Sequence, residues 1–124
     1  MGRINGRAID SMQLPSDSTI ARSKVTHYLL IWQARGDKSR FLALAGYDVF
    51  RPDQLIHDIR VQVLPCAAVP LESTEHGQYY EISCPLTGPN GRTLDIRAIW
   101  MTEHLSGQTK FITLIPERSR QNDH

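Results

Sequence analysis

The sequence predicts an α+β fold in which two to three N-terminal helices pack on one face of a four-stranded antiparallel β-meander. Three observations lead to this prediction. Apolar residues recur at helical spacing in the first half of the chain and at period two in the second half, and a Pro-Asn-Gly turn at residues 89–91 separates two of the strand-like segments. Because apolar helix stripes need a surface to cover, we expect the helices to lie on the apolar face of the sheet.

The two central strands carry the clearest alternation. In the segment Gln78 to Leu86, the residues expected to share one face are Tyr80, Ile82, Cys84 and Leu86. In the segment Arg92 to Met101, one face carries Leu94, Ile96, Ala98 and Trp100, and the other carries Asp95, Arg97, Ile99 and Met101. The second segment should therefore lie at the centre of the sheet and be buried on both sides toward its end.

The outer strands are expected on either side of this pair. Ala67 to Thr74 contains Pro70, which lacks a backbone N–H, so this segment is predicted as an edge strand that turns at His76-Gly77. Lys110 to Pro116 is predicted as the last strand. Its expected shared face carries Phe111, Thr113 and Ile115.

Three helices are predicted before the meander. The first has Ser23 as its N-cap and an apolar stripe formed by Val25, Tyr28, Leu29 and Trp32. The second follows Gly36, with Asp37 as its cap, Phe41, Leu44 and Ala45 as its buried face and Gly46 as its left-handed stop. The third begins at Pro52, buries Leu55, Ile56, Ile59 and Val63, and ends at Leu64-Pro65.

A chain of 124 residues is long enough for one core and too short for two. We predict one domain at residues 22–116, a flexible arm at residues 1–21 and a flexible tail at residues 117–124. No apolar run reaches the length of a membrane span, and no signal peptide is evident, so a cytoplasmic location without membrane contact is expected.

The net charge of +1 argues against a dedicated nucleic-acid coat but leaves room for a local basic patch. Cys66 and Cys84 have no metal-ligand spacing, so we interpret them as reduced packing residues. Neither a metal nor a cofactor is predicted.

Lys38 and Arg40 stand out in the second helix. They place two cations in its first turn, where the helix dipole is positive, at a cost of about 0.3–1 kcal/mol each. A bound phosphate would offset this cost, because helix amino termini offer free N–H groups. The alternative is that both residues are solvated beside the acidic cap Asp37.

Four stretches also resemble a known family: KVTHYLL, GDKSRFLALAGY, GQYYEISCPLTGPNGRTLDIRAIW and KFITLIP. In this order they resemble the bacterial family called domain of unknown function 6883, with its YLL-type helix, G-x-KARFF-like turn and helix, Gly-aromatic pair, PxGR hairpin, Trp-ending strand and TxxP strand. The matching positions are Gly36, Lys38, Gly46, Trp100, Thr113 and Pro116. The chain departs from the pattern at Ser39, Leu42 and Leu114-Ile115, where the family favours Ala, Phe and Ala-Tyr.

The order of elements in that family is similar to that of the barnase, colicin and RelE-like ribonucleases, which include toxin domains. The similarity implies RNA as a partner and metal-independent cleavage, which needs a base for the 2′-hydroxyl, an acid for the 5′-oxygen and cations around the phosphate. The implied catalytic candidates are Lys38, His27, Arg97 and Thr113, with Lys38 and Arg40 as phosphate ligands.

Each candidate also has a purely structural interpretation. His27 would be a surface or boundary residue, Arg97 a cross-strand partner of Glu81 or Glu72, Thr113 a β-branched strand residue, and Trp100 a core aromatic whose N–H is hydrogen-bonded at the sheet edge. A second function class therefore stays open. It is a non-catalytic module that binds a small protein encoded nearby, as in toxin–antitoxin or immunity systems, and the near-neutral charge favours it.

Overall fold

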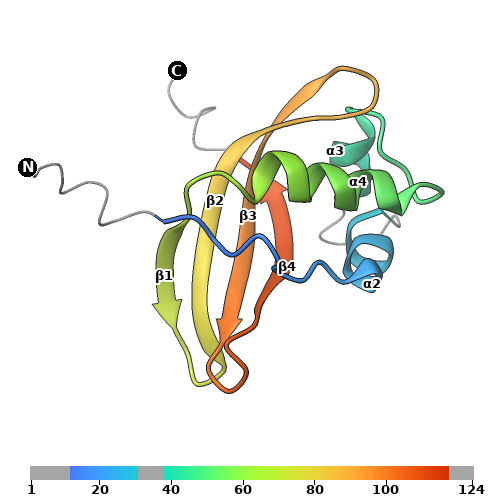
Figure 1. The fold of residues 1–124 in the computed structure, drawn as a ribbon. Coiled ribbons are helices and arrows are strands. Elements are labelled where there is room, and N and C mark those ends of the chain that lie inside the picture. Colours follow the sequence, from blue (N-terminus) through green and yellow to red (C-terminus); the bar gives the residue numbers. More distant parts are fainter. Residues whose placement is uncertain (1–11, 31–37, 118–124) are drawn as a thin grey trace, which may run out of the picture.

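Four antiparallel strands form one sheet in the order β1-β2-β3-β4 (Figure 1). The computed structural model describes residues 12–30 and 38–117. Its helical elements are α2 (Arg22–Lys24), η1 (Val25–Leu30), α3 (Ser39–Ala43), α4 (Pro52–Asp58) and η2 (Ile59–Val63), and its strands are β1 (Val69–Ser73), β2 (Gly77–Thr87), β3 (Thr93–Glu103) and β4 (Thr109–Pro116). The predicted α+β class and the antiparallel meander are confirmed.

The central pair of strands follows the predicted alternation. β2 and β3 pair without a register shift from Gly77↔Glu103 to Thr87↔Thr93. The core face of β3 carries Leu94, Ile96, Ala98 and Trp100, all of them buried. On the opposite face Met101 is buried as well, so β3 is covered on both sides toward its end.

β1 is an edge strand, as Pro70 predicted. Pro70 pairs with Tyr80, and the register shifts between Pro70 and Ser73. A proline and a bulge together leave a poor template for another strand. This edge is therefore protected from pairing with a further chain.

The predicted face of β4 is wrong from Thr113 onward. Trp100 pairs with Phe111 and Ile99 pairs with Thr113, so Ile112 is an extra residue that bulges out of β4. A bulge reverses the alternation. Phe111 and Leu114 therefore face the core, whereas Thr113 lies on the opposite face with Ile99.

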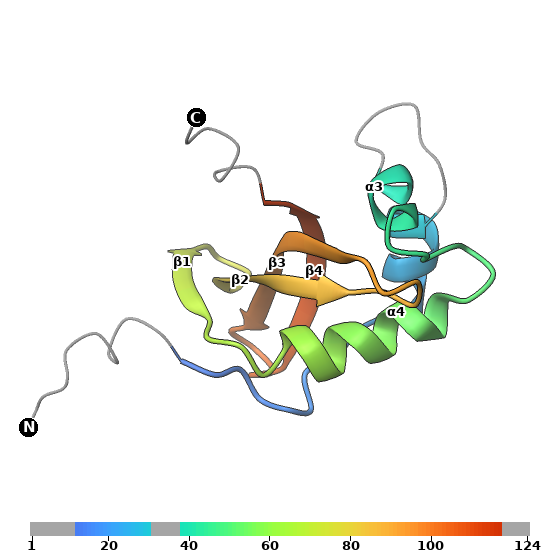
Figure 2. The ribbon, with the colours of Figure 1, turned by 90° about the horizontal axis from the view of Figure 1, so that it is seen from above.

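The third predicted helix forms as expected and continues into η2 as a π-helix. Pro52 occupies its first turn, and Leu55, Ile59 and Val63 are fully buried. Figures 1 and 2 show α4 and η2 lying across one face of β2 and β3. The shared cluster of buried residues between helix and sheet is the core of the protein.

The first two predicted helices need corrections. The first begins at Arg22 with Ala21 as its N-cap, so Ser23 lies inside the helix. Of the predicted buried face of the second helix, Ala45 is buried and Phe41 packs against the core. Leu44, the C-cap of α3, is 46% exposed, and Leu42 is fully buried in its place. Gly46 has the expected left-handed φ of 95°. The N-cap of α3 is Lys38 and not the predicted Asp37, so Lys38 precedes the first turn. The predicted roles of Trp32 and Gly36 fall outside the described residues.

The segment before Arg22 was predicted as part of a flexible arm, but residues 12–21 pack on the sheet. Met12 pairs with Ala68 just before β1, and Thr19 pairs with Lys110 of β4. Leu14, between these two points, and Ile20, directly after Thr19, are buried. Figures 1 and 2 show the segment crossing the sheet on the same side as α4.

Candidate functional site

Two residues of the matched motifs meet at the β4 edge of the sheet. Lys38 is the N-cap of α3, and its Nζ donates a hydrogen bond to Thr113 Oγ1 at 2.9 Å. The bulge at Ile112 makes this contact possible, because it turns Thr113 away from the core. Burial lowers the pKa of the half-buried Lys38 amine below its usual value. No carboxylate of the described residues forms an ion pair with Lys38.

Arg97 lies on the same outer face of the sheet as Thr113. It pairs with Ile115, which places Thr113 diagonally across the two strands. Its guanidinium lies 3.8 Å from Glu81 and 3.8 Å from Glu117. The predicted cross-strand pairing with Glu81 is therefore present, and Arg97 carries a charge that two carboxylates already compensate.

The remaining candidates are His27 and Arg40. His27 is exposed on η1 and Arg40 is exposed on α3, and within residues 12–30 and 38–117 no hydrogen bond joins either to Lys38, Thr113 or Arg97. Since α3 has five residues, its macrodipole gives little support to an anion. Any anion site here must rest on the Lys38 side chain.

The hairpin turn and Gly46, which also belong to the matched motifs, pack against each other, and the sequence did not reveal this contact. The Pro89-Asn90 turn between β2 and β3 docks on the end of α3, where Asn90 N donates to the Ala45 carbonyl at 3.2 Å and Asn90 Nδ2 donates to the Leu44 carbonyl at 3.0 Å. A Cβ on Gly46 would lie 3.2 Å from Pro89 Cγ. Close packing of the two turns explains why glycine suits this position.

A buried polar network supports the same region. Tyr47 donates a hydrogen bond to Asp58 Oδ2 at 2.6 Å, and Gln54 Nε2 donates to Asp58 Oδ1 at 3.1 Å. Tyr47 and Asp58 are both buried. Burial, with the hydrogen bond to Asp58, raises the pKa of the Tyr47 hydroxyl. No periodic pattern in the sequence distinguished these residues.

Trp100 is a core residue, and its predicted hydrogen bond is absent. The side chain is fully buried and meets Phe111 edge-on at a centroid distance of 5.3 Å. Its Nε1 has no hydrogen-bond partner among the described residues. The two cysteines are free thiols in contact, and burial beside Cys66 raises the pKa of the Cys84 thiol to about 12.

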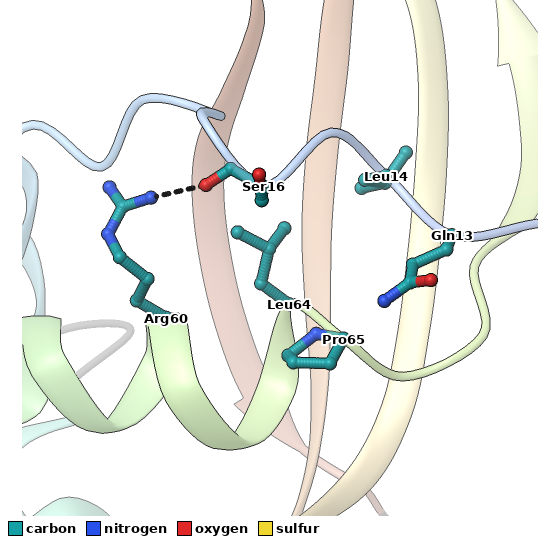
Figure 3. A pocket seen from close by; sticks show the side chains of 6 residues that line it. All are labelled: Gln13, Leu14, Ser16, Arg60, Leu64 and Pro65. Carbon is teal, nitrogen blue, oxygen red and sulfur yellow. Dashed lines mark hydrogen bonds between the residues drawn. The ribbon is translucent and has the colours of Figure 1, made fainter.

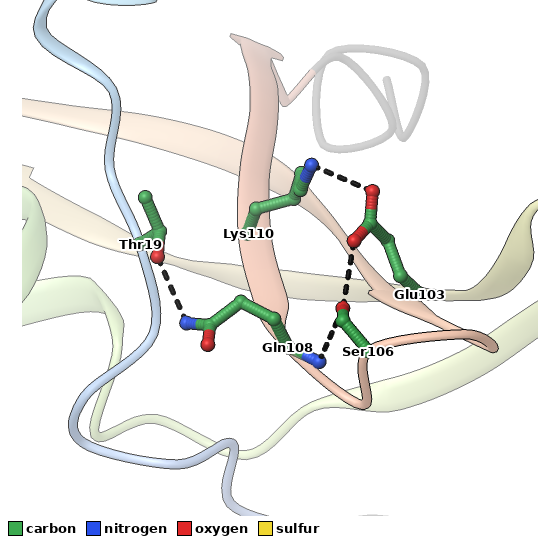
Figure 4. Close-up of polar contacts among 5 residues, drawn as sticks. All are labelled: Thr19, Glu103, Ser106, Gln108 and Lys110. Carbon is green, nitrogen blue, oxygen red and sulfur yellow. Dashed lines mark hydrogen bonds and ion pairs between the residues drawn. The ribbon is translucent and has the colours of Figure 1, made fainter.

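The β3–β4 turn holds a further polar cluster (Figure 4). Glu103 accepts hydrogen bonds from Lys110 Nζ at 2.8 Å and from Ser106 Oγ at 2.7 Å, and both lower the pKa of its carboxyl. Gln108 Nε2 donates to Thr19 Oγ1 at 2.8 Å. Because every member has a partner inside the cluster, this network anchors the turn to the segment before α2.

Neither a membrane helix nor a metal cluster is found in the described part of the chain. No helix there is long and apolar enough to cross a bilayer. No group of three or more His, Cys, Asp or Glu side chains there could hold a metal ion.

An antiparallel sheet covered on one side by short helices, with a lysine–threonine pair at its edge, defines a small α+β domain. The family described as domain of unknown function (DUF6883) matches residues 14–118, and the chain belongs to it. No curated protein and no solved structure matches the chain.

Proposed function

We propose that the chain is an RNA-binding domain that contacts the phosphodiester backbone at the Lys38–Thr113 pair. The 2.9 Å contact supports this most directly, because it joins the two motif-matched residues whose side chains suit polar chemistry. A half-buried ammonium that has no carboxylate partner among the described residues attracts an anion more strongly than a solvated one. The backbone phosphate is the commonest contact of proteins that bind nucleic acids.

We further propose that the same pair supports cleavage without a metal. A lysine with a lowered pKa is neutral more often and can accept the proton of a ribose 2′-hydroxyl. The 2′-oxygen would attack phosphorus, the bond to the 5′-oxygen would break, and an acid would protonate the leaving oxygen. The products would be a 2′,3′-cyclic phosphate and a 5′-hydroxyl, with Thr113 orienting Lys38 and His27 as the candidate acid.

Arg97 would act in this reaction only after a rearrangement. Its distances of 3.8 Å to Glu81 and Glu117 exceed those of a direct hydrogen bond. A phosphate could therefore compete with these carboxylates for the guanidinium. Arg40, exposed on α3, would add a second phosphate contact.

The second candidate function is a non-catalytic module that binds a small protein partner. The acidic surroundings of Arg97 favour it, because Glu81 and Glu117 share its face of the sheet and would repel an RNA backbone. The same acidic face would complement a basic partner protein. A test of RNA binding separates the two functions.

The test compares wild type with three variants on a short fluorescent single-stranded RNA in EDTA. Lys38→Ala should weaken binding by roughly 1.5–3 kcal/mol, the scale of a charge-assisted hydrogen bond. Lys38→Arg keeps the cation but cannot act as a base, so it should bind RNA and fail to cleave it. Arg51→Ala, which removes an exposed cation at the N-cap of α4, is the control for net charge.

The outcomes are distinct. Cyclic phosphate ends with wild type, and none with Lys38→Arg, support cleavage. Binding without these products supports RNA binding alone. If wild type neither binds nor cleaves RNA, and cells that express it grow normally, the protein-interaction function replaces the RNA function.

A further inference from the structure

A concave site on the opposite side of the molecule from the sheet's outer face has no part in the function proposed above. It lies between the segment before α2 and the end of η2, and its volume is about 240 Å³ (Figure 3). The lining residues are Gln13, Leu14, Ser16, Arg60, Leu64 and Pro65. Sites for drug-sized ligands measure about 300–1,000 Å³, so this one suits a smaller molecule.

The walls of the site are apolar and part of them belongs to the core. Leu14 and Leu64 are almost fully buried, and the few atoms they expose form the floor of the site. Pro65 adds a further apolar wall. A single aromatic ring or a branched aliphatic chain would replace water over these surfaces, which is favourable because it removes apolar area from water.

The rim carries donors that the described residues leave unused. Arg60 Nη1 donates to the Ser16 carbonyl at 3.0 Å (Figure 3), which is one of the five N–H groups of a guanidinium. The Gln13 amide makes no hydrogen bond with the described part of the chain, and Figure 3 shows it beside Pro65. Among the described residues, no acidic side chain lines the site.

We propose that this site binds a small carboxylic acid whose apolar body rests on Leu14, Leu64 and Pro65 and whose carboxylate is held by Arg60. The end of η2 opposes an anion, because the carboxyl end of a helix carries a partial negative charge. A charge-assisted hydrogen bond is stronger than this repulsion, so the attraction to Arg60 is the larger effect. Gln13 supplies a second, neutral donor.

Phenylacetate is the probe, and phenylacetamide is its neutral control. Methyl NMR of the full chain should show saturable shifts at Leu14 and Leu64 with phenylacetate and much smaller ones with phenylacetamide. Arg60→Gln should raise the Kd for phenylacetate about ten- to a hundredfold, the range of one charge-assisted bond. Gln13→Leu should raise it by less, and Arg51→Gln, an exposed arginine outside the site, should leave it unchanged.

Wild-type shifts need no substitution, so the test does not depend on how Arg60→Gln folds. Absence of saturable shifts at millimolar phenylacetate would overturn the proposal. Equal binding of the acid and the amide would also overturn it, as would an unchanged Kd in Arg60→Gln. None of these results bears on RNA binding at Lys38, because the two sites share no residue.

Discussion

Lys38 is the residue in which sequence motif and structural setting coincide. Its amine is half-buried and hydrogen-bonded to a neutral hydroxyl, so burial of the charge has no ionic compensation among the described residues. The folded-state pKa lies below the ordinary value of 10.5. Between these two pKa values the unfolded chain binds more protons than the folded one, so the free energy of unfolding rises with pH.

Lys38→Met should remove this dependence. At pH 7 the variant should be as stable as wild type or slightly more stable, because an uncompensated buried charge is gone. As the pH rises toward 10.5, the free energy of unfolding of wild type should increase relative to that of the variant. Urea unfolding of both proteins across this range measures the difference, and a difference that stays constant with pH would contradict the prediction.

Tyr47 gives stability a pH dependence opposite to that from Lys38. Burial and Asp58 raise the pKa of its hydroxyl, so above about pH 10 the folded state keeps a proton that the unfolded chain loses. The stability that this proton supports is present below pH 10 and is lost as the pH rises further. Tyr47→Phe should cost about 1.5–3 kcal/mol at pH 7, because it removes a hydrogen bond to a buried carboxylate.

The same variant should also lose the alkaline destabilisation. Thermal melts of wild type and Tyr47→Phe at pH 7 and pH 10.5 test both effects. Tyr80→Phe is the matched control, since Tyr80 is a half-buried tyrosine without a side-chain hydrogen bond to the described residues. Parallel curves for wild type and Tyr47→Phe would show that the Tyr47 hydroxyl is not the group responsible.

At the scale of single residues, the sequence identified candidate site residues but did not predict which of them are in contact. The motif match selected Lys38 and Thr113, and nothing in their spacing revealed that they meet. Their contact depends on a bulge that no glycine marks. Asp58 was missed because a single acidic residue in an amphipathic helix is usually exposed, and here Tyr47 and Gln54 satisfy it in the core.

Among the elements, the β2–β3 hairpin carries the most specific packing. Its turn fits against the end of α3 so closely that a Cβ on Gly88 would overlap the Ala45 carbonyl oxygen and lie 2.6 Å from Ala45 Cβ. The turn was predicted from Pro-Asn-Gly chemistry alone. Its docking surface is a tertiary feature, because it rests on hydrogen bonds from Asn90 to the Leu44 and Ala45 carbonyls, which no sequence pattern reports.

Gly88→Ala should therefore destabilise the protein by about 1–3 kcal/mol through overpacking. Gly91→Ala is the comparison. Its Cβ would meet open space, so its cost of about 1–2 kcal/mol should come from the left-handed φ of 88° alone. Urea unfolding measures both, and NMR shifts at Ala45 and Asn90 should change strongly only for Gly88→Ala. Unchanged Ala45 signals in Gly88→Ala would contradict close docking of the hairpin.

Strands and helices differed in how well their pattern could be interpreted. The predicted faces of β2 and β3 agree with the structure, because apolar and polar residues alternate along both strands and the two strands pair without a register shift. The first helix was placed two residues late because Ser23 is a favourable N-cap, whereas the actual cap, Ala21, makes no side-chain hydrogen bond. In α3 a helix of five residues offers too few positions to define a face, so Leu42 and Leu44 were interchanged.

At the scale of the whole molecule, residues 12–20 join the two edges of the sheet. Met12 N donates to the Ala68 carbonyl at 2.9 Å beside β1, and Phe111 N of β4 donates to the Thr19 carbonyl at 2.8 Å. The segment has no sustained period because it is neither helix nor long strand. The segment contributes to stability through isolated buried apolar residues. Such residues show no periodic pattern, which is why the segment was predicted to be a flexible arm.

A chain that begins at Arg22 should consequently be largely unfolded. Loss of the buried Leu14 and Ile20 side chains costs about 2–5 kcal/mol each, judged from large-to-small substitutions in cores. Their sum approaches the total stability of an ordinary domain, which is about 5–15 kcal/mol. The loss of the backbone pairs at Met12 and Thr19 adds to this cost.

The comparison is a chain that begins at Met12, which keeps every contact described above. Near-UV circular dichroism and urea unfolding should show cooperative folding for this chain and little or none for the one that begins at Arg22. Leu14→Ala in the full chain should fall between them, with a loss of about 2–5 kcal/mol. Equal stability of the chains that begin at Met12 and Arg22 would show that the crossing segment does not hold the sheet, and the fold would then rest on the helices and strands alone.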